Sequence, residues 1–364
     1  MPTLTYKCPS CAAPLIYEGR EQVLQCNSCG NSFPVETVRQ VSEIEQQDQQ
    51  GSQTSWNMQD KPFTPEEMER TKTYSCSSCG AELLTDDTTV ATNCAFCGSP
   101  SIIPAQFTPG TRPDIIIPFL VKKQEAEDKF HSYFRGKKLL PNLFLQGRNQ
   151  IDEIRQLYVP YWLFTCEADA NMTYNATRVS TMRSGQYMVT TTKHFLVRRA
   201  GTLAFRDLPI DASDQVDNDI TETLEPYDTA SAIDFVPETL SGAMANRANV
   251  SPEACKQRAD QRISNTTENL FRRTVSGYNS VTTRSANIRI DDGTSVPVLF
   301  PIWLITTSRE GKTYTFAING QTGELTTNIP YSKGKFFGWT LGVAAGATAA
   351  GFVAATVLRS MGVM

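Results

Sequence analysis

Histidine is scarce in this chain of 364 residues, which contains only two. Neither His131 nor His194 has a cysteine or a carboxylate at a spacing that would form a nucleophile–base pair or a catalytic metal site. The sequence also lacks a Gly-x-x-x-x-Gly-Lys-Ser/Thr phosphate loop and a dinucleotide-binding fingerprint. We therefore expect no enzymatic activity and neither catalytic nor cofactor-binding residues. Catalysis would require a site that the sequence does not reveal.

A strong excess of charge is missing as well, because the net charge is only −4. Binding to the phosphate backbone of a nucleic acid requires a cationic surface. Between Tyr74 and Pro104, however, the chain has no lysine or arginine. We therefore do not expect nucleic acid as a partner. A nucleic-acid-binding protein of replication or transcription remains the alternative function.

Cysteine, in contrast, is plentiful, and eight of the ten cysteines form a pattern that occurs twice. Each copy consists of two Cys-x-x-Cys pairs, and each cysteine of the second copy follows its counterpart by the same interval. The first copy is Cys8, Cys11, Cys26 and Cys29, and the second copy is Cys76, Cys79, Cys94 and Cys97. The residues around them also match, since Tyr6 corresponds to Tyr74 and Leu15 to Leu83.

Four thiolates presented as two such pairs satisfy a tetrahedral zinc ion, so each copy predicts a zinc ribbon with one structural Zn²⁺ held by four cysteines. Glycine follows Cys29, Cys79 and Cys97, where the turn needs a residue with positive φ. Disulfides, cysteines that only fill the core, and iron in a rubredoxin-like site remain alternatives. Four sulfur ligands close the coordination shell, so we expect no metal-activated water.

Residues 336–358 form an apolar stretch of twenty-three residues without a charge. As a helix they would rise about 34 Å, enough to cross a hydrocarbon core of about 30 Å. Lys333 and Lys335 precede the stretch, and the chain begins without a signal-like apolar run. We expect a single-pass protein of the cytoplasmic membrane with a cytosolic N-terminal region. A buried helix is the alternative, and the glycines of this helix could let two copies pair into a homo-oligomer.

The remaining residues predict an α+β domain with an antiparallel sheet. Apolar and polar residues alternate from Trp162 to Tyr174, as in a half-buried antiparallel strand, and Cys166 lies on its inner face. A helix is expected from Ser251, with Cys255 in its buried stripe. The predicted organisation is multi-domain: zinc ribbon 1 at 1–37, a flexible linker at 38–71, zinc ribbon 2 at 72–104, the α+β domain at 105–331 and a transmembrane helix at 336–358.

Several segments resemble a family of bacterial membrane-anchored proteins that carry TFIIB-type zinc ribbons, the YdjG-like proteins. The resemblance rests on residues 116–119, 158–164, 224–228 and 316–323. It implies a single-pass adaptor or scaffold that recruits cytosolic or membrane-associated proteins, of the SPFH or phage-shock type, in membrane-stress assemblies. The expected function is thus a non-enzymatic membrane-anchored adaptor at the inner face of the cytoplasmic membrane.

Overall fold

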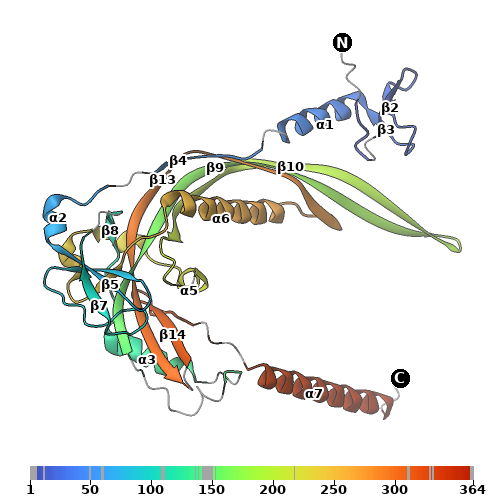
Figure 1. The fold of residues 1–364 in the computed structure, drawn as a ribbon. Coiled ribbons are helices and arrows are strands. Elements are labelled where there is room, and N and C mark those ends of the chain that lie inside the picture. Colours follow the sequence, from blue (N-terminus) through green and yellow to red (C-terminus); the bar gives the residue numbers. More distant parts are fainter. Residues whose placement is uncertain are drawn as a thin grey trace. The chain divides into compact units, whose positions relative to one another are not determined.

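The structure is a computed structural model that describes residues 6–10, 13–48, 51–58, 61–107, 111–135, 137, 139–141, 151, 153–216, 218–309, 312–327, 329 and 332–360. The chain divides into two compact units. The first unit comprises Met1–Gln59, Leu163–Leu208 and Lys256–Ser295, and the second comprises Asp60–Trp162, Pro209–Cys255 and Val296–Met364. Three of the boundaries fall within the long strands β9 (Glu153–Ser184), β10 (Tyr187–Asp211) and β13 (Ser280–Arg309) (Figure 1).

The first unit begins with a small cysteine-containing module, which we call the first module (residues 1–37). It is a three-stranded antiparallel sheet of β1 (Ile16–Glu18), β2 (Val23–Gln25) and β3 (Ser32–Pro34). Cys8, Leu15, Leu24, Cys26 and Val38 form its buried core. Val38 belongs to helix α1 (Val35–Asp48), so the helix that follows the module also closes its core.

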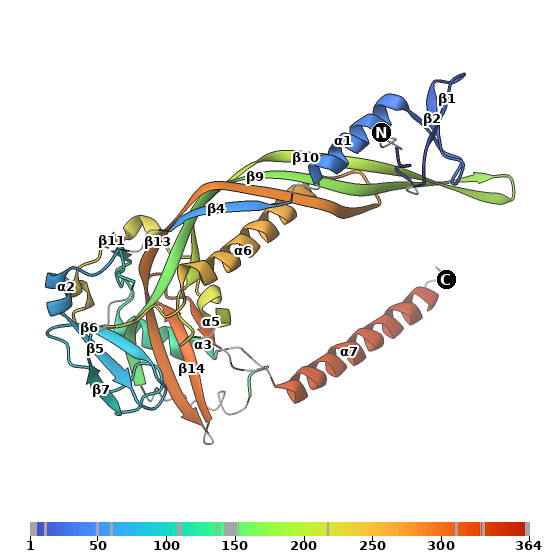
Figure 2. The same cartoon turned by 45° about the horizontal axis from the view of Figure 1, so that its top comes forward.

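The rest of the first unit is a curved sheet covered by helix α6 (Pro252–Arg273) (Figure 2). Cys166, Ala168, Ala170, Met172 and Tyr174 on β9 are all buried and pack with Ile263 of α6. These five residues are alternate positions of the strand, so the predicted half-buried strand is confirmed. The alternation of apolar and polar residues predicts this strand correctly because one face of β9 packs against α6 while the other remains accessible.

Residues 38–71, expected to be a flexible linker, contain most of α1, the strand β4 (Gln53–Met58) and the helix α2 (Pro65–Glu69) in the part that the structure describes. Strand β4 pairs in parallel with β13, with Trp56 opposite Gly293. A Cβ at Gly293 would lie 2.5 Å from the Trp56 ring, so only glycine leaves room for the indole. The Trp56 Nε1–H donates to Asp260 of α6 at 2.9 Å. The sequence did not reveal this strand, because its composition is polar and one aromatic side chain provides most of its packing.

The second unit is built on a mixed sheet in which neighbouring strands follow the order β11-β8-β13-β9-β12-β6-β5-β7. Its shorter strands are β5 (Thr71–Cys76), β6 (Glu82–Asp86), β7 (Ile102–Ala105), β8 (Ile115–Ile116), β11 (Ile233–Asp234), β12 (Met244–Asn246), β14 (Lys312–Asn319) and β15 (Leu325–Thr327). The β5–β6, β6–β12 and β13–β14 pairs are antiparallel, whereas β8–β13 and β9–β12 are parallel. The expected antiparallel pairing is therefore found in part, because the large sheet is mixed. Long connections return β12 to β9 and β13 to β8 in the same direction, as parallel pairing requires.

Helix α3 (Lys123–Tyr133) covers the β13–β14 part of this sheet. Ala126, Phe130 and Phe134 are buried against Trp303 and Phe316. The Phe130 and Phe316 rings meet edge-to-face at 4.9 Å. Helix α5 (Asn218–Thr223) and two short 3₁₀ turns, Thr229–Ser231 and Pro237–Leu240, lie in the connections of the same unit.

The C-terminal helix α7 spans Lys333–Ser360. Its segment Lys333–Ala355 is long and apolar enough to cross a membrane, and none of this segment is buried within the structure. The exposed side chains of Phe336, Phe337 and Leu341 would leave a large apolar area in water if the protein were soluble. The described part of the chain therefore does not support the alternative of a buried core helix.

Candidate metal centres

The structure brings the cysteines of the second module (residues 72–104) together. The sulfur atoms of Cys76, Cys79, Cys94 and Cys97 all lie within 4.8 Å of one another. The Sγ–Sγ distance is 3.6 Å for Cys76–Cys97 and 3.6 Å for Cys79–Cys94. A disulfide bond would measure about 2.05 Å, whereas a tetrahedral ion with metal–sulfur bonds of about 2.3 Å has edges of about 3.8 Å. The four free thiols are thus spaced as ligands of one ion.

Each Cys-x-x-Cys pair of this module is shaped by the same backbone turn. Gly80 N–H donates to Cys76 O at 2.9 Å, and Gly98 N–H donates to Cys94 O at 3.1 Å. Both glycines have a φ of 75°, the left-handed conformation that a side chain disfavours. The turn points both sulfurs of a pair toward the same place, as predicted from the glycines in the sequence.

Burial and hydrogen bonds give the thiols of the second cluster different pKa values. Burial raises the pKa of Cys76, but backbone N–H groups of Cys79 and Ser78 directed at its sulfur outweigh burial and lower the pKa to about 7. Burial, followed by the thiols of Cys94, Cys97 and Cys76, raises the pKa of Cys79 to about 12. Cys76 therefore ionises more readily than Cys79, and a bound cation would displace the remaining protons.

A buried arginine lies against the second cluster. Arg155 of β9 is 8% exposed, and its Nη1 donates to the carbonyl oxygens of Cys94 and of Ala95, the latter at 3.1 Å. Its Nη2 pairs with Glu153. Burial lowers the pKa of Arg155, whereas Cys94 and Cys97 raise it. The guanidinium thus fixes the second Cys-x-x-Cys turn and places a positive charge beside sulfurs that would become anionic on binding a metal.

Arg155 was not anticipated from the sequence. A single arginine within a run of mixed polar and apolar residues has no distinguishing spacing. Its role depends on the fold, which brings β9 close to the module in space although Cys94 and Arg155 are far apart in the chain.

The first module repeats this arrangement. The sulfurs of Cys8, Cys26 and Cys29 lie within 4.8 Å of one another, and Cys8 Sγ is 3.6 Å from Cys29 Sγ. Gly30 has a φ of 73°, and its N–H donates to Cys26 O at 2.9 Å. Cys11, the fourth expected ligand, lies outside the described residues, so the four-cysteine set of this site stays a prediction.

The two modules also share their strand register. The bridge between Lys7 and Pro14 in the first module matches the pair Ser75–Glu82 in the second, at equivalent positions of the repeat. The duplication seen in the sequence therefore extends to the backbone.

The modules differ in what surrounds them. In the second module, β6 pairs with β12, Leu84 opposite Ala245, and Leu84 is buried in a core with Tyr158. In the first module the equivalent strand β1 pairs instead with the module's own β2. Ile16, the counterpart of Leu84, is 57% exposed, and Tyr17 is 55% exposed. The second module is therefore part of the larger sheet, while the first is completed by its own strands.

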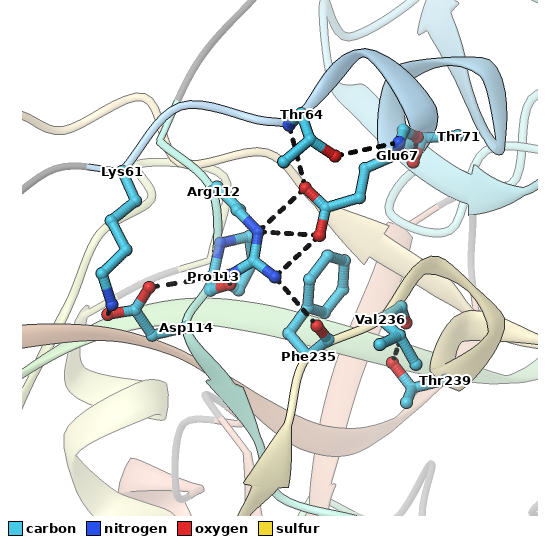
Figure 3. Close-up of polar contacts among 10 residues, drawn as sticks. All are labelled: Lys61, Thr64, Glu67, Thr71, Arg112, Pro113, Asp114, Phe235, Val236 and Thr239. Atoms are coloured by element: carbon cyan, nitrogen blue, oxygen red, sulfur yellow. Dashed lines mark hydrogen bonds and ion pairs between the residues drawn. The ribbon is translucent and has the colours of Figure 1, made fainter.

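A network of charged residues connects the segment that leads into the second module with the large mixed sheet of the second unit (Figure 3). Thr64 and Glu67 form a capping box at the start of α2. Arg112 donates to both carboxylate oxygens of Glu67, at 2.7 and 3.0 Å, and to Phe235 O at 3.1 Å. Hydrogen bonding from Arg112 lowers the pKa of Glu67. Since α2 leads directly into β5, this network holds the strand that carries Cys76.

The other candidate residues have structural surroundings. Cys166 and Cys255 are buried, as expected for small apolar side chains, and burial raises the pKa of Cys166 to about 11. The His131 ring packs edge-to-face on Phe130 at 5.4 Å. Neither His131 nor His194 belongs to a metal-ligand cluster among the described residues.

Fold and sites together define a class of protein: a mixed β-sheet protein with two cysteine clusters that could each hold a metal ion and a terminal helix apolar enough to cross a membrane. The chain belongs to the family of the uncharacterized protein YdjG of Bacillus subtilis (strain 168). The two are 32% identical over 343 residues, which is 94% of this chain and 95% of that protein. No family model matches the chain, and no solved structure matches it.

Proposed function

We propose that the protein is a non-enzymatic adaptor, anchored in the cytoplasmic membrane by α7, that binds two structural zinc ions and recruits a protein partner. The observation that carries this proposal is the closed cluster of four sulfurs in the second module, repeated by the three described sulfurs of the first. Four thiolates leave a zinc ion no open position for substrate or water. A site of this kind serves folding rather than chemistry.

Zinc supplies what the small first module cannot build by packing. Its buried core contains only a few side chains, two of them cysteines, and domains of this size usually need a metal or disulfides. A structural Cys₄ zinc site contributes on the order of 10 kcal/mol to folding. Iron would fit the same ligands, so the identity of the metal is part of the proposal.

The first module is the better candidate for the recruiting surface. The second module uses its β6 edge and Leu84 to join the larger sheet. The first module presents Ile16 and Tyr17 to solvent at the positions where the second is covered. We therefore assign scaffold support to the second zinc site and partner binding to the first.

The partner is a cytosolic or membrane-associated protein, and the family resemblance points to proteins of the SPFH or phage-shock type. The N-terminal side of α7 faces the cytosol in this proposal, in agreement with Lys333 and Lys335 beside the helix. Reducing conditions there would keep the thiols free for metal.

Affinity purification of the full chain from membranes tests the proposal. The double variant I16S/Y17S should keep two zinc ions and membrane association but lose its specific partner. The matched variant V236S, at an exposed apolar residue of the second unit, should keep the partner. Co-purification of the same proteins with I16S/Y17S would refute the assigned surface. Salt-sensitive binding of the purified chain to DNA, without a protein partner, would favour the alternative of a nucleic-acid-binding protein.

A further inference from the structure

The hairpin of β9 and β10 in the first unit carries a surface that the adaptor role does not use. From residue 178 to residue 194 every residue is exposed. Five apolar side chains stand in this exposed stretch or at its edge: Val179, Met182, Tyr187, Met188 and Val189. Met182, Tyr187 and Met188 are 70%, 78% and 68% exposed. Clustered apolar side chains that remain in water mark an interaction surface.

The base of the hairpin is fixed by packing. The Arg178 guanidinium lies 5.6 Å from the Phe195 ring and 5.5 Å from the Tyr278 ring, and its Nε donates to Gly277 O at 3.2 Å. Val179 N–H donates to Asn279 Oδ1 at 2.8 Å. The exposed surface therefore begins at a defined point, just beyond Arg178.

Beyond this base lies the hairpin tip, residues 180–193. The side-chain contacts that the described structure shows here join the hairpin to itself: Thr181 meets Thr190 at 3.4 Å, and Arg183 Nε donates to Gly185 O at 3.2 Å. Gly185 turns the chain with a φ of 64°. A two-stranded ribbon of this kind is marginally stable by itself, so the tip is suited to gain order from a partner.

The charge of the hairpin is opposite to that of the whole chain. Residues 170–206 contain no aspartate or glutamate, while the chain as a whole has a net charge of −4. The cations of this segment are Arg178, Arg183, Lys193, Arg198, Arg199 and Arg206. Residues 184–192 carry no charge and are flanked by Arg183 and Lys193. The tip thus contains an uncharged segment of apolar, tyrosine and threonine residues that is bordered on both sides by cations.

We infer that the hairpin tip inserts into the interface of a membrane that contains anionic lipids. Met182, Tyr187 and Met188 would enter the boundary between headgroups and acyl chains, while Arg183 and Lys193 would contact lipid phosphates. The β9–β10 pairing satisfies the inward-facing backbone groups, and the outward-facing groups of the two edges would stay at the depth of the hydrated headgroups, which limits insertion to the interface. This inference rests on the membrane anchor of the proposed function, because α7 would confine the hairpin near a bilayer and so make a weak contact sufficient.

Two other partners of the hairpin tip, a single-stranded nucleic acid and a second copy of the hairpin, fit less well. A single-stranded nucleic acid would use cations and several stacking rings, but the tip offers one aromatic residue, Tyr187, and the methionine side chains would gain little. A second copy of the hairpin would bring two clusters of like charge together, which is unfavourable. Charge complementarity and the apolar tip both favour anionic lipid.

Hydrogen exchange on the full chain in lipid nanodiscs tests this inference. The discs contain either phosphatidylcholine alone or phosphatidylcholine with phosphatidylglycerol, and the readout is exchange of residues 176–196. In anionic discs we expect exchange at least about tenfold slower than in neutral discs, with part of the protection lost at high salt. The triple variant M182S/Y187S/M188S should lose the protection and keep its metal content. R183E/K193E should lose the difference between the two lipids.

I16S/Y17S is the matched control, because it also removes exposed apolar side chains but should leave the hairpin protected. Equal exchange in both kinds of disc would overturn the inference. Protection of the hairpin in neutral detergent would also overturn the inference, because it would indicate a protein contact. Protection by added DNA would overturn it as well. A chain that enters the discs with an unprotected hairpin contradicts only this inference. A chain that does not associate with anionic discs contradicts the membrane anchor as well.

Discussion

Replacement of Arg155 by methionine provides the sharpest test of how the second metal site is supported. The substitution keeps an unbranched side chain of similar length and removes the guanidinium. Arg155 is 8% exposed and donates to the carbonyl oxygens of Cys94 and Ala95. In R155M both carbonyls would lack these donors, and the sulfurs of Cys94 and Cys97 would lose a nearby positive charge.

The size of the effect follows from these contacts. An unsatisfied buried carbonyl costs about 1–3 kcal/mol, so two of them should destabilise the second unit by about 2–6 kcal/mol. Loss of Glu153 as a partner should add little, because its side chain is 33% exposed. Removal of groups that orient metal ligands lowers metal affinity by about 10–100-fold. The second site should therefore bind zinc about 10–100-fold more weakly, while the first site is unchanged.

Competition with a chromophoric chelator measures this prediction on the full chain in detergent. Wild-type protein should release two zinc ions with similar affinity, and R155M should release one of them at a much lower chelator concentration. R39M is the matched control, because the ion pairs of Arg39 with Glu36 and Glu43 are exposed, so this variant should behave as wild type. Identical release curves for R155M and wild type would refute the role assigned to the guanidinium.

Three further predictions concern packing and pH. L84A should destabilise the second unit by about 2–4 kcal/mol, whereas I16A at the equivalent exposed position should cost less than about 0.5 kcal/mol. Similar urea midpoints for the two variants would contradict the difference between the modules. F130A should lower the free energy of unfolding by about 3–5 kcal/mol, because the Phe130 ring is fully buried between helix α3 and the sheet. An unchanged urea midpoint would be incompatible with this packing. Because Arg112 lowers the pKa of Glu67, the stabilisation by Glu67 is complete above its unfolded pKa of about 4.3 and is lost as the pH falls through its lower folded pKa. E67Q should therefore be less stable than wild type at pH 7, and this difference should shrink at acidic pH; a constant difference across the pH range would argue against the Arg112 contact.

The cysteine clusters could be predicted from the sequence because their chemistry is local. A Cys-x-x-Cys pair followed by glycine specifies its own turn, and Gly80 and Gly98 indeed adopt the left-handed conformation there. The alternation along β9 was equally readable, since burial on one face imposes a period of two.

Long-range features could not be predicted in this way. Strands β8 and β12 contain only two and three residues, too few to show a period, and their parallel partners are far away in the chain. The strand β4 contains a single large apolar anchor, Trp56, whose ring packs edge-to-face on Phe164 at 5.0 Å. Arg155 shows its role only when β9 and the second module are seen together. Each of these features depends on tertiary contacts that override local propensity.

Metal analysis of the full chain, purified from membranes under reducing conditions, tests the central claim most directly. Elemental mass spectrometry should find two zinc ions per chain in wild-type protein. C94S should retain one, because the first cluster is built from separate strands. Wild-type protein that holds no metal, a single ion, or iron in place of zinc would contradict the account.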